Sequence, residues 1–181
     1  MPSLEYVVGR NYQEIYHPDV RIVSFPDRET TITAAANRII STAIYTEYPI
    51  FQLATGSTME PVYEKVAQAV GIGAVNFDRA HITHLDGRHP MDTTHPSSFG
   101  GFIKNRAGIP WKIPIEQVCL INEQAENPWE EAARYEELLK VLVPHLFVAG
   151  IGPPEDPHAA FIGRGTSFDM GVHYIPKLPD A

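Results

Sequence analysis

Five short apolar runs recur along this sequence, and segments with helical spacing separate them. Each run is nearly continuous in apolar character and has the length of a strand. The runs lie at 21–25 (RIVSF), 49–54 (PIFQLA), 80–85 (AHITHL), 117–122 (QVCLIN) and 145–151 (HLFVAGI). Strands that are apolar on both sides fit a parallel sheet that is covered on both faces. We therefore predict a single α/β domain over residues 1–181, with a Rossmann-like, mostly parallel sheet and helices on both faces.

The segments between the runs predict helices. Asp27 is a candidate N-cap for a helix that extends to about Tyr45. The clearest helical segment is 128–142, PWEEAARYEELLKVL, which has a proline near its start and acidic residues in its first turn. Two further helices are predicted at about 60–70 and 97–105. The last ten residues, VHYIPKLPDA, contain no closing helix, so they fit either the end of a fragment or an edge segment.

Composition narrows the classes of protein that the chain can belong to. The formal net charge is −8, and no basic patch or stripe interrupts it, so we expect no nucleic-acid partner. No apolar run is long enough to cross a bilayer, and the N-terminus lacks the pattern of a secretory signal. The single cysteine, Cys119, allows no internal disulfide and fits a buried site in a reducing compartment. We therefore expect a cytoplasmic protein without a membrane partner, for which an anionic small substrate remains compatible.

Polar loops that contain glycine follow three of the predicted strands. They lie at 55–58, 86–95 and 152–166. In parallel sheets of this kind, ligands bind beyond the carboxyl ends of the strands. Three such loops together indicate one binding site more strongly than any one of them alone.

The first of these loops, ATGST, has the composition of an anion cradle. Gly56 allows a sharp turn, so amide groups and hydroxyls can point toward one anion at the start of the following helix. The spacing of a Walker loop is absent. An ordinary strand–helix turn explains the same residues equally simply.

The other two loops carry candidate acid–base groups. Asp86 ends the third run, on the same side of the strand as His84, and it could move a proton between adjacent carbons or simply cap a turn. Asp156 lies two residues before His158, where a carboxylate could orient the imidazole for acid–base chemistry. A solvated loop is the alternative for this second pair.

Histidines are numerous around the 80–95 segment, but their spacing does not favour a metal site. His81 and His84 are three residues apart on a predicted strand, so they point to opposite faces. No His-x-x-x-His helix or cysteine pair accompanies them. We therefore expect no metal.

Taken together, the three loops resemble one family. The segments FQLATGSTMEPVYEKV, THLDGRHPMDTTHPSSFGGFI and AGIGPPEDPHAAFIGRGTSF are similar, in order and spacing, to the glucosamine-6-phosphate deaminase/isomerase family. That family is similar in turn to the 6-phosphogluconolactonases. The resemblance extends from Tyr16 to Phe168, which is most of the chain.

The resemblance implies a substrate, a reaction and roles for the loop residues. The substrate would be an aminosugar 6-phosphate, and no cofactor would be needed. The sugar ring would open, a proton would move between C2 and C1 through an enolamine, and ammonia would leave to give a ketose 6-phosphate. Asp86 would shuttle the proton, and His158, oriented by Asp156, would catalyse ring opening. The substrate phosphate would be held by Thr55, Gly56, Ser57 and Thr58.

This sequence departs from the family pattern at two places. The family usually carries Asp-Glu-Tyr where this chain has Asp86-Gly87-Arg88, and the glutamate expected to partner the histidine is Gly163 here. Glu155 is a candidate substitute for that acid. The cations available to complete a phosphate site are Arg88, Lys104, Arg164 and Lys177.

These departures leave three functions open. A deaminase or isomerase needs Asp86, whereas a 6-phosphogluconolactonase would use His158 to activate water and would need Asp86 less. A non-catalytic sugar-phosphate sensor would need neither group for chemistry, although no DNA-binding segment is recognisable. A homo-oligomer is compatible with each of the three.

Overall fold

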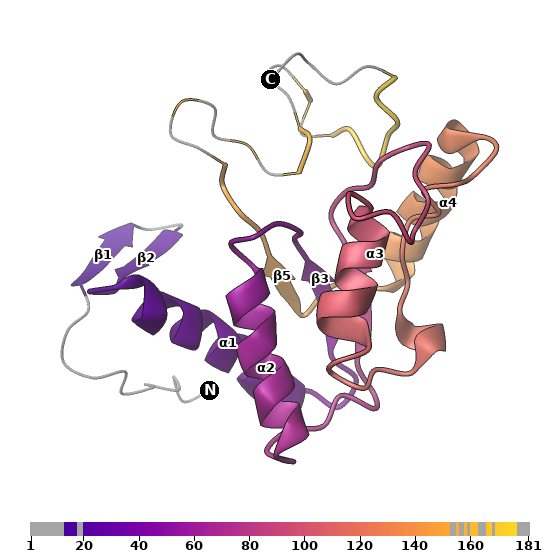
Figure 1. Cartoon of the computed structure of the whole chain (residues 1–181). Coiled ribbons are helices and arrows are strands. Elements are labelled where there is room, and N and C mark those ends of the chain that lie inside the picture. Colours follow the sequence, from indigo (N-terminus) through magenta and orange to yellow (C-terminus); the bar gives the residue numbers. More distant parts are fainter. Residues whose placement is uncertain are drawn as a thin grey trace.

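The centre of the molecule is a three-stranded parallel sheet (Figure 1). The computed structural model describes residues 13–17, 20–152, 155, 158, 160–162, 166–167 and 169–176. Strand β3 (Ile50–Leu53) lies between β4 (His81–His84) and β5 (Leu146–Val148) and is parallel to both. This arrangement confirms the predicted α/β fold with a mostly parallel sheet.

The first predicted strand lies outside this sheet. Strands β1 (Gln13–His17) and β2 (Val20–Ser24) form a separate antiparallel hairpin, in which Ile15 is opposite Ile22. Figure 1 shows the hairpin beside the start of the first helix. The expected strand at 21–25 therefore forms, but it pairs with its own neighbour in the sequence.

The predicted strand at 117–122 is wrong for most of its length. A 3-10 helix, η2 (Ile115–Gln117), overlaps its start, and only one bridge joins Val118 to Ile82 in β4. Beyond that bridge, the Tyr135 hydroxyl takes the place of a strand: it accepts a hydrogen bond from the His84 N–H (2.9 Å) and donates one to the His84 carbonyl (2.8 Å). The main-chain groups of β4 are thus satisfied by a side chain at this point.

The helices begin where the sequence predicts. Helix α1 (Arg28–Tyr45) has Asp27 as its N-cap, whose carboxylate accepts the Thr30 N–H at 2.7 Å. Helix α2 spans Glu60–Gly71, and helix α4 spans Pro128–Val141 with proline in its first turn. Helix α3 (Phe99–Ile103) is short and continues into a π-helical turn, η1 (Lys104–Gly108).

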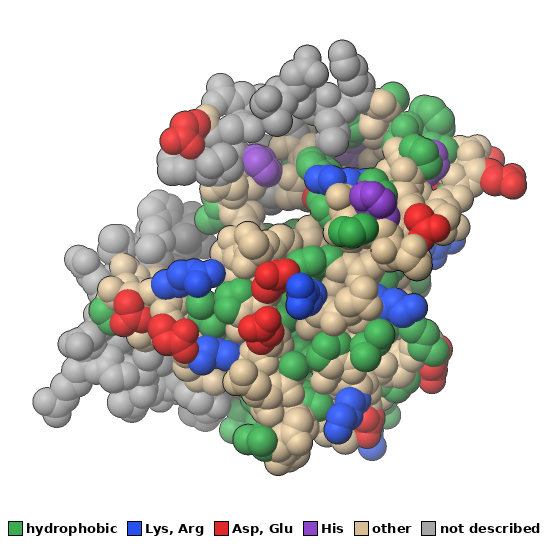
Figure 2. Space-filling view, in the orientation of Figure 1, with side chains coloured by type: hydrophobic (Ala, Val, Ile, Leu, Met, Phe, Trp, Pro, Cys, Tyr) green, Lys and Arg blue, Asp and Glu red, His purple; other side chains and the backbone are tan. Residues whose placement is uncertain are grey.

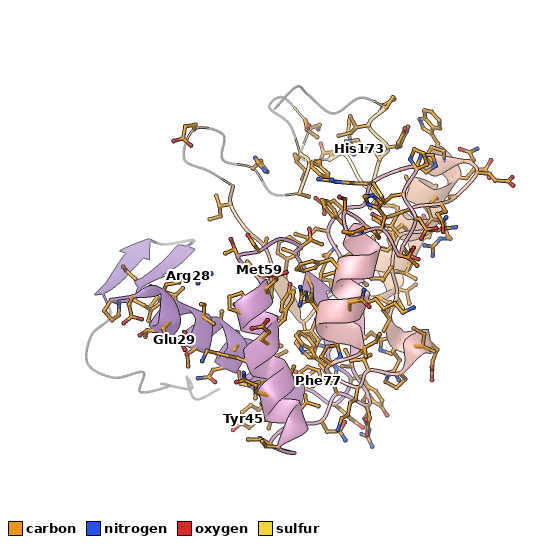
Figure 3. The ribbon with its side chains drawn as sticks, viewed as in Figure 1. Arg28, Glu29, Tyr45, Met59, Phe77 and His173 are labelled. Atoms are coloured by element: carbon orange, nitrogen blue, oxygen red, sulfur yellow. The ribbon has the colours of Figure 1, made fainter. Side chains whose placement is uncertain are left out.

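The main core lies between the sheet and α1, α2 and η1. Phe51, Tyr63, Phe77 and Trp111 form an aromatic cluster with exposed fractions of 1% or less. The Trp111 ring is 5.0 Å from Phe77 and 5.5 Å from Tyr63, and its indole N–H donates to the Tyr63 carbonyl. Figure 3 shows Phe77 at the end of the sheet opposite to the strand-end loops.

Helix α4 lies on the opposite side of the sheet, beside β4 (Figure 1). Thr83 points away from the face that carries its neighbour Ile82, and its hydroxyl interacts with Tyr135 of α4. Helices therefore lie on both sides of the sheet, as predicted (Figure 1). None of the helices in the described part of the chain combines the length and the apolar character needed to span a membrane.

Candidate functional site

Three loops leave the sheet at one edge because its three strands are parallel and adjacent. The loop at 55–58 follows β3, the loop beginning at Leu85 follows β4, and Gly150 follows β5. Neighbouring strands are about 5 Å apart, so the three loops begin within roughly 10 Å of one another. This is the edge at which open α/β sheets bind ligands.

A cavity of about 1380 Å³ opens at this edge. Gln52 of β3, Asp86 after β4 and Phe147 of β5 contribute to its lining, together with residues 166–167 and 170–176. Its volume exceeds the roughly 300–1,000 Å³ typical of small-molecule sites. Figure 2 shows histidine side chains at this end of the molecule, and Figure 3 shows His173 on the segment above the sheet.

Asp86 is the most perturbed carboxyl group in this cavity. Burial raises its pKa from 3.8 to about 6, and the negative charge of Glu123 adds to the rise. The charges of Arg88 and His158 act in the opposite direction. A carboxyl group with this pKa exchanges protons readily near neutral pH, which suits a general base.

His158 lines the same cavity as Asp86, and the two side chains interact electrostatically. Its backbone N–H donates to the Ile151 carbonyl at 2.7 Å, so the loop after β5 folds back on itself. The structure thus brings together two of the three residues that the sequence nominates for catalysis. The third, Asp156, lies outside the described residues, as do Gly163, Arg164 and Lys177. Glu155 is exposed.

The loop Thr55–Thr58 lies at the same edge of the sheet but does not line this cavity. Gly56 has a φ of 108°, which favours glycine, and its carbonyl accepts the Met59 N–H at 3.0 Å. Ser57 and Thr58 are exposed. Met59 is the N-cap residue of α2 (Figure 3), and its side chain forms no hydrogen bond with the first N–H groups of the helix. The start of α2 is therefore open to an anion.

Arg88 is the described cation that faces Asp86. Its guanidinium lies 4.6 Å from the centre of the Phe99 ring, and Phe99 stacks on Phe161 at 5.7 Å. This stacking holds a positive charge at the cavity wall. Lys104, another cation considered from the sequence, lies on η1 and does not line the cavity.

Glu123 is a site residue that the sequence reasoning missed. Its side chain is 1% exposed, and its carboxylate accepts N–H groups of Arg88 (2.8 Å), Phe99 (3.2 Å) and Gly100 (3.3 Å) and the Ser98 hydroxyl. One signal was present in the sequence: Glu123 directly follows the apolar run at 117–122, at the same kind of position as Asp86.

His84 has a different environment from Asp86, although both were expected on one side of a strand. It is fully buried outside the cavity lining, and burial lowers its pKa from 6.5 to about 3. Neither ring nitrogen has a hydrogen-bond partner. Across the described ranges, no group of three or more histidine, cysteine, aspartate or glutamate side chains could hold a metal ion.

The protein is thus an α/β protein with a cavity at the carboxyl ends of its parallel strands, in which a carboxyl group and an imidazole interact. Residues 26–165 match the family described as glucosamine-6-phosphate isomerases/6-phosphogluconolactonase, and the chain belongs to that family.

Relatives with assigned names agree with this membership. The chain is 35% identical over 126 residues to a glucosamine-6-phosphate deaminase of Exiguobacterium sp., a match that covers 68% of this chain and 46% of the relative. A deaminase of Lysinibacillus sphaericus is 33% identical, covering 69% and 53%. The chain thus spans about half the length of the curated relatives it matches.

Solved structures support the fold. A monomeric glucosamine-6-phosphate deaminase superposes with a TM-score of 0.75 at 23% identity, covering 80% of this chain and 59% of that chain. A 6-phosphogluconolactonase from Thermotoga maritima gives 0.61 at 21% identity, covering 74% and 58%. Both branches of the family therefore share this architecture.

Proposed function

We propose that the protein is an aminosugar-phosphate deaminase/isomerase that acts on glucosamine 6-phosphate or a related hexosamine 6-phosphate. The observation that carries this proposal is a carboxyl group with a pKa of about 6, Asp86, beside His158 in one cavity. The names of the relatives and the resemblance of the three loops supply the class of substrate.

The proposed reaction needs two kinds of proton transfer. His158 moves a proton between the ring oxygen and the C1 hydroxyl, which opens the pyranose to the aldehyde. Asp86 then removes the C2 proton and returns it to C1, and the C1 oxygen takes up a proton that the C2 ammonium group loses, so the aldehyde passes through the enolamine to an imine at C2. Addition of water to this imine and loss of ammonia give the ketose 6-phosphate. Asp156 is proposed to orient the imidazole.

The phosphate of the substrate is assigned to Thr55, Gly56, Ser57 and Thr58. The exposed Ser57 and Thr58 hydroxyls and the uncapped start of α2 offer donors and a partial positive charge. The loop is one strand away from Asp86 in the sheet, a spacing that suits a substrate with its phosphate and its reacting carbons at opposite ends.

The test of this function is ammonia release from glucosamine 6-phosphate by the wild type and by Asp86→Asn. We expect kcat to fall by about 100-fold or more, because the amide cannot take up the C2 proton. The matched control is Asp78→Asn, a change at the amino end of the sheet and outside the cavity, which should keep wild-type turnover. An unchanged kcat in Asp86→Asn would contradict the proposal.

The second candidate is a 6-phosphogluconolactonase, which is favoured by the presence of His158 in the cavity and by the structural match to such an enzyme. In that reaction, His158 would activate water. Hydrolysis of 6-phosphogluconolactone that survives in Asp86→Asn but is lost in His158→Ala would favour this candidate. Stabilisation by a sugar phosphate without turnover of either substrate would favour a sensor.

A further inference from the structure

Gly87, the residue after Asp86, lies directly against Glu123. A Cβ atom at Gly87 would be 3.2 Å from the Glu123 Cγ and 3.4 Å from its Oε1. The φ of Gly87 is not positive, so its backbone could carry a side chain without strain. The space beside Asp86 is therefore filled by a carboxylate that comes from elsewhere in the chain.

We propose that Glu123 supplies a carboxylate beside Asp86 from the neighbouring segment, and that it acts as a positioning residue that holds the loop after Asp86 against the start of α3. The catalytic consequence of this inference rests on the proposed function, whereas its structural part does not.

The contacts of Glu123 join two segments that flank the cavity. One carboxylate oxygen accepts the Arg88 N–H, which fixes the loop just after Asp86. The carboxylate also accepts the N–H groups of Phe99 and Gly100 and the hydroxyl of Ser98, which is the N-cap of α3. The Glu123 backbone carbonyl accepts the Met91 N–H at 2.9 Å, so the far end of the same loop is held too.

The position of Glu123 also affects the charge of Asp86. Among the described residues, the charged groups that act on Asp86 are Arg88, Glu123 and His158. Of these, only Glu123 is negative, so it adds to burial in raising the pKa of Asp86. Removing the Glu123 charge should therefore make Asp86 a weaker base.

A carboxylate exchange tests the structural part of the inference. Glu123→Ala leaves buried donors without an acceptor and should lower Tm by roughly 5–10 °C. Gly87→Glu alone should also lower Tm, because its side chain would collide with Glu123 and place two negative charges together. The double variant Gly87→Glu/Glu123→Ala should recover most of the lost Tm. A double variant whose loss equals the sum of the two single losses overturns the inference.

The charge effect is tested with Glu123→Gln, which keeps the shape of the side chain. The pKa of Asp86, followed by carbon-13 NMR of its carboxyl carbon, should fall by several tenths of a unit or more. The matched control is Glu116→Gln, an exposed site outside the cavity lining, and there the pKa of Asp86 should stay at the wild-type value. An unchanged pKa in Glu123→Gln contradicts the electrostatic role.

Neither measurement needs turnover, so the two proposals can fail separately. A rescued double variant in a protein that releases no ammonia supports the positioning role and counts against the proposed function. If ammonia is released, kcat should fall in Glu123→Ala and recover in the double variant. Turnover that is unaffected by Glu123→Ala overturns the positioning role.

Discussion

At the scale of single residues, Asp86 shows a conflict between stability and chemistry. Burial keeps its carboxyl group protonated up to a pH of about 6, so its ionisation at neutral pH costs the folded state free energy. The same burial that destabilises the carboxylate also makes it a stronger base than an exposed aspartate. Residues of this kind are typical of active sites, where stability is lost in favour of reactivity.

Asp86→Asn should therefore stabilise the protein while it removes activity. Because the pKa of Asp86 is higher in the folded state than the ordinary value of 3.8, the folded state loses stability as the pH rises from about 4 to 6. Above this range, the variant should be more stable than the wild type by about 2 kcal/mol. Urea unfolding at pH 7.5 measures the gain. Repeating it at pH 4 is the control, where the gain should shrink toward zero. A variant less stable than the wild type at pH 7.5 would contradict this reasoning.

At the scale of elements, the most informative contact is the one between α4 and the free edge of β4. The Tyr135 hydroxyl bonds both main-chain groups of His84, in place of the strand that the apolar run at 117–122 predicts. The same helix is tied to the segment before it, because Glu131 accepts the Asn122 N–H at 2.6 Å and pairs with Arg134. Side chains of α4 thus replace backbone pairing along this edge.

Tyr135→Phe should destabilise the fold by about 1–3 kcal/mol, because it leaves the N–H and the carbonyl of His84 buried without partners. Urea denaturation measures this change. Tyr45→Phe is the matched control: Tyr45 is 66% exposed at the end of α1, so the loss of its hydroxyl should change the free energy of unfolding by less than about 0.5 kcal/mol. Equal effects of the two substitutions would show that the His84 contacts contribute nothing.

At the scale of the whole molecule, the parallel sheet, its helices and the edge that carries the loops follow from the sequence. Continuous apolar runs, Asp27 and the proline at the start of α4 are local signals, and the structure agrees with them. The placement of β1 and β2 in their own hairpin and the loss of the strand at 117–122 depend on tertiary pairing, which no local pattern records. Glu123 was missed for the same reason, since its partners lie 23 to 35 residues away in the sequence.

The acid stability of the whole protein should depend on His84. Its pKa is about 3 in the folded state and 6.5 ordinarily. Between these two pH values, the imidazole binds a proton in the unfolded chain but not in the folded one. The contribution of His84 to stability is therefore complete above pH 6.5 and falls by about 1.4 kcal/mol per unit as the pH decreases toward 3. His84→Leu should flatten the dependence of unfolding free energy on pH between 6.5 and 5, because all other titrating groups are shared with the wild type. Identical slopes in the two proteins would rule out this role of His84.

The Tyr135 hydroxyl at the free edge of β4 also affects whether two copies of the molecule can associate through their strands. An exposed strand edge invites a foreign strand to add to it, which is a common route to aggregation. At His84, the main-chain N–H and carbonyl already form hydrogen bonds with Tyr135, so they are not free to pair with a strand from another molecule. Together with the bridge between Val118 and Ile82, this one side chain leaves the edge of β4 with few main-chain groups available for intermolecular β-pairing.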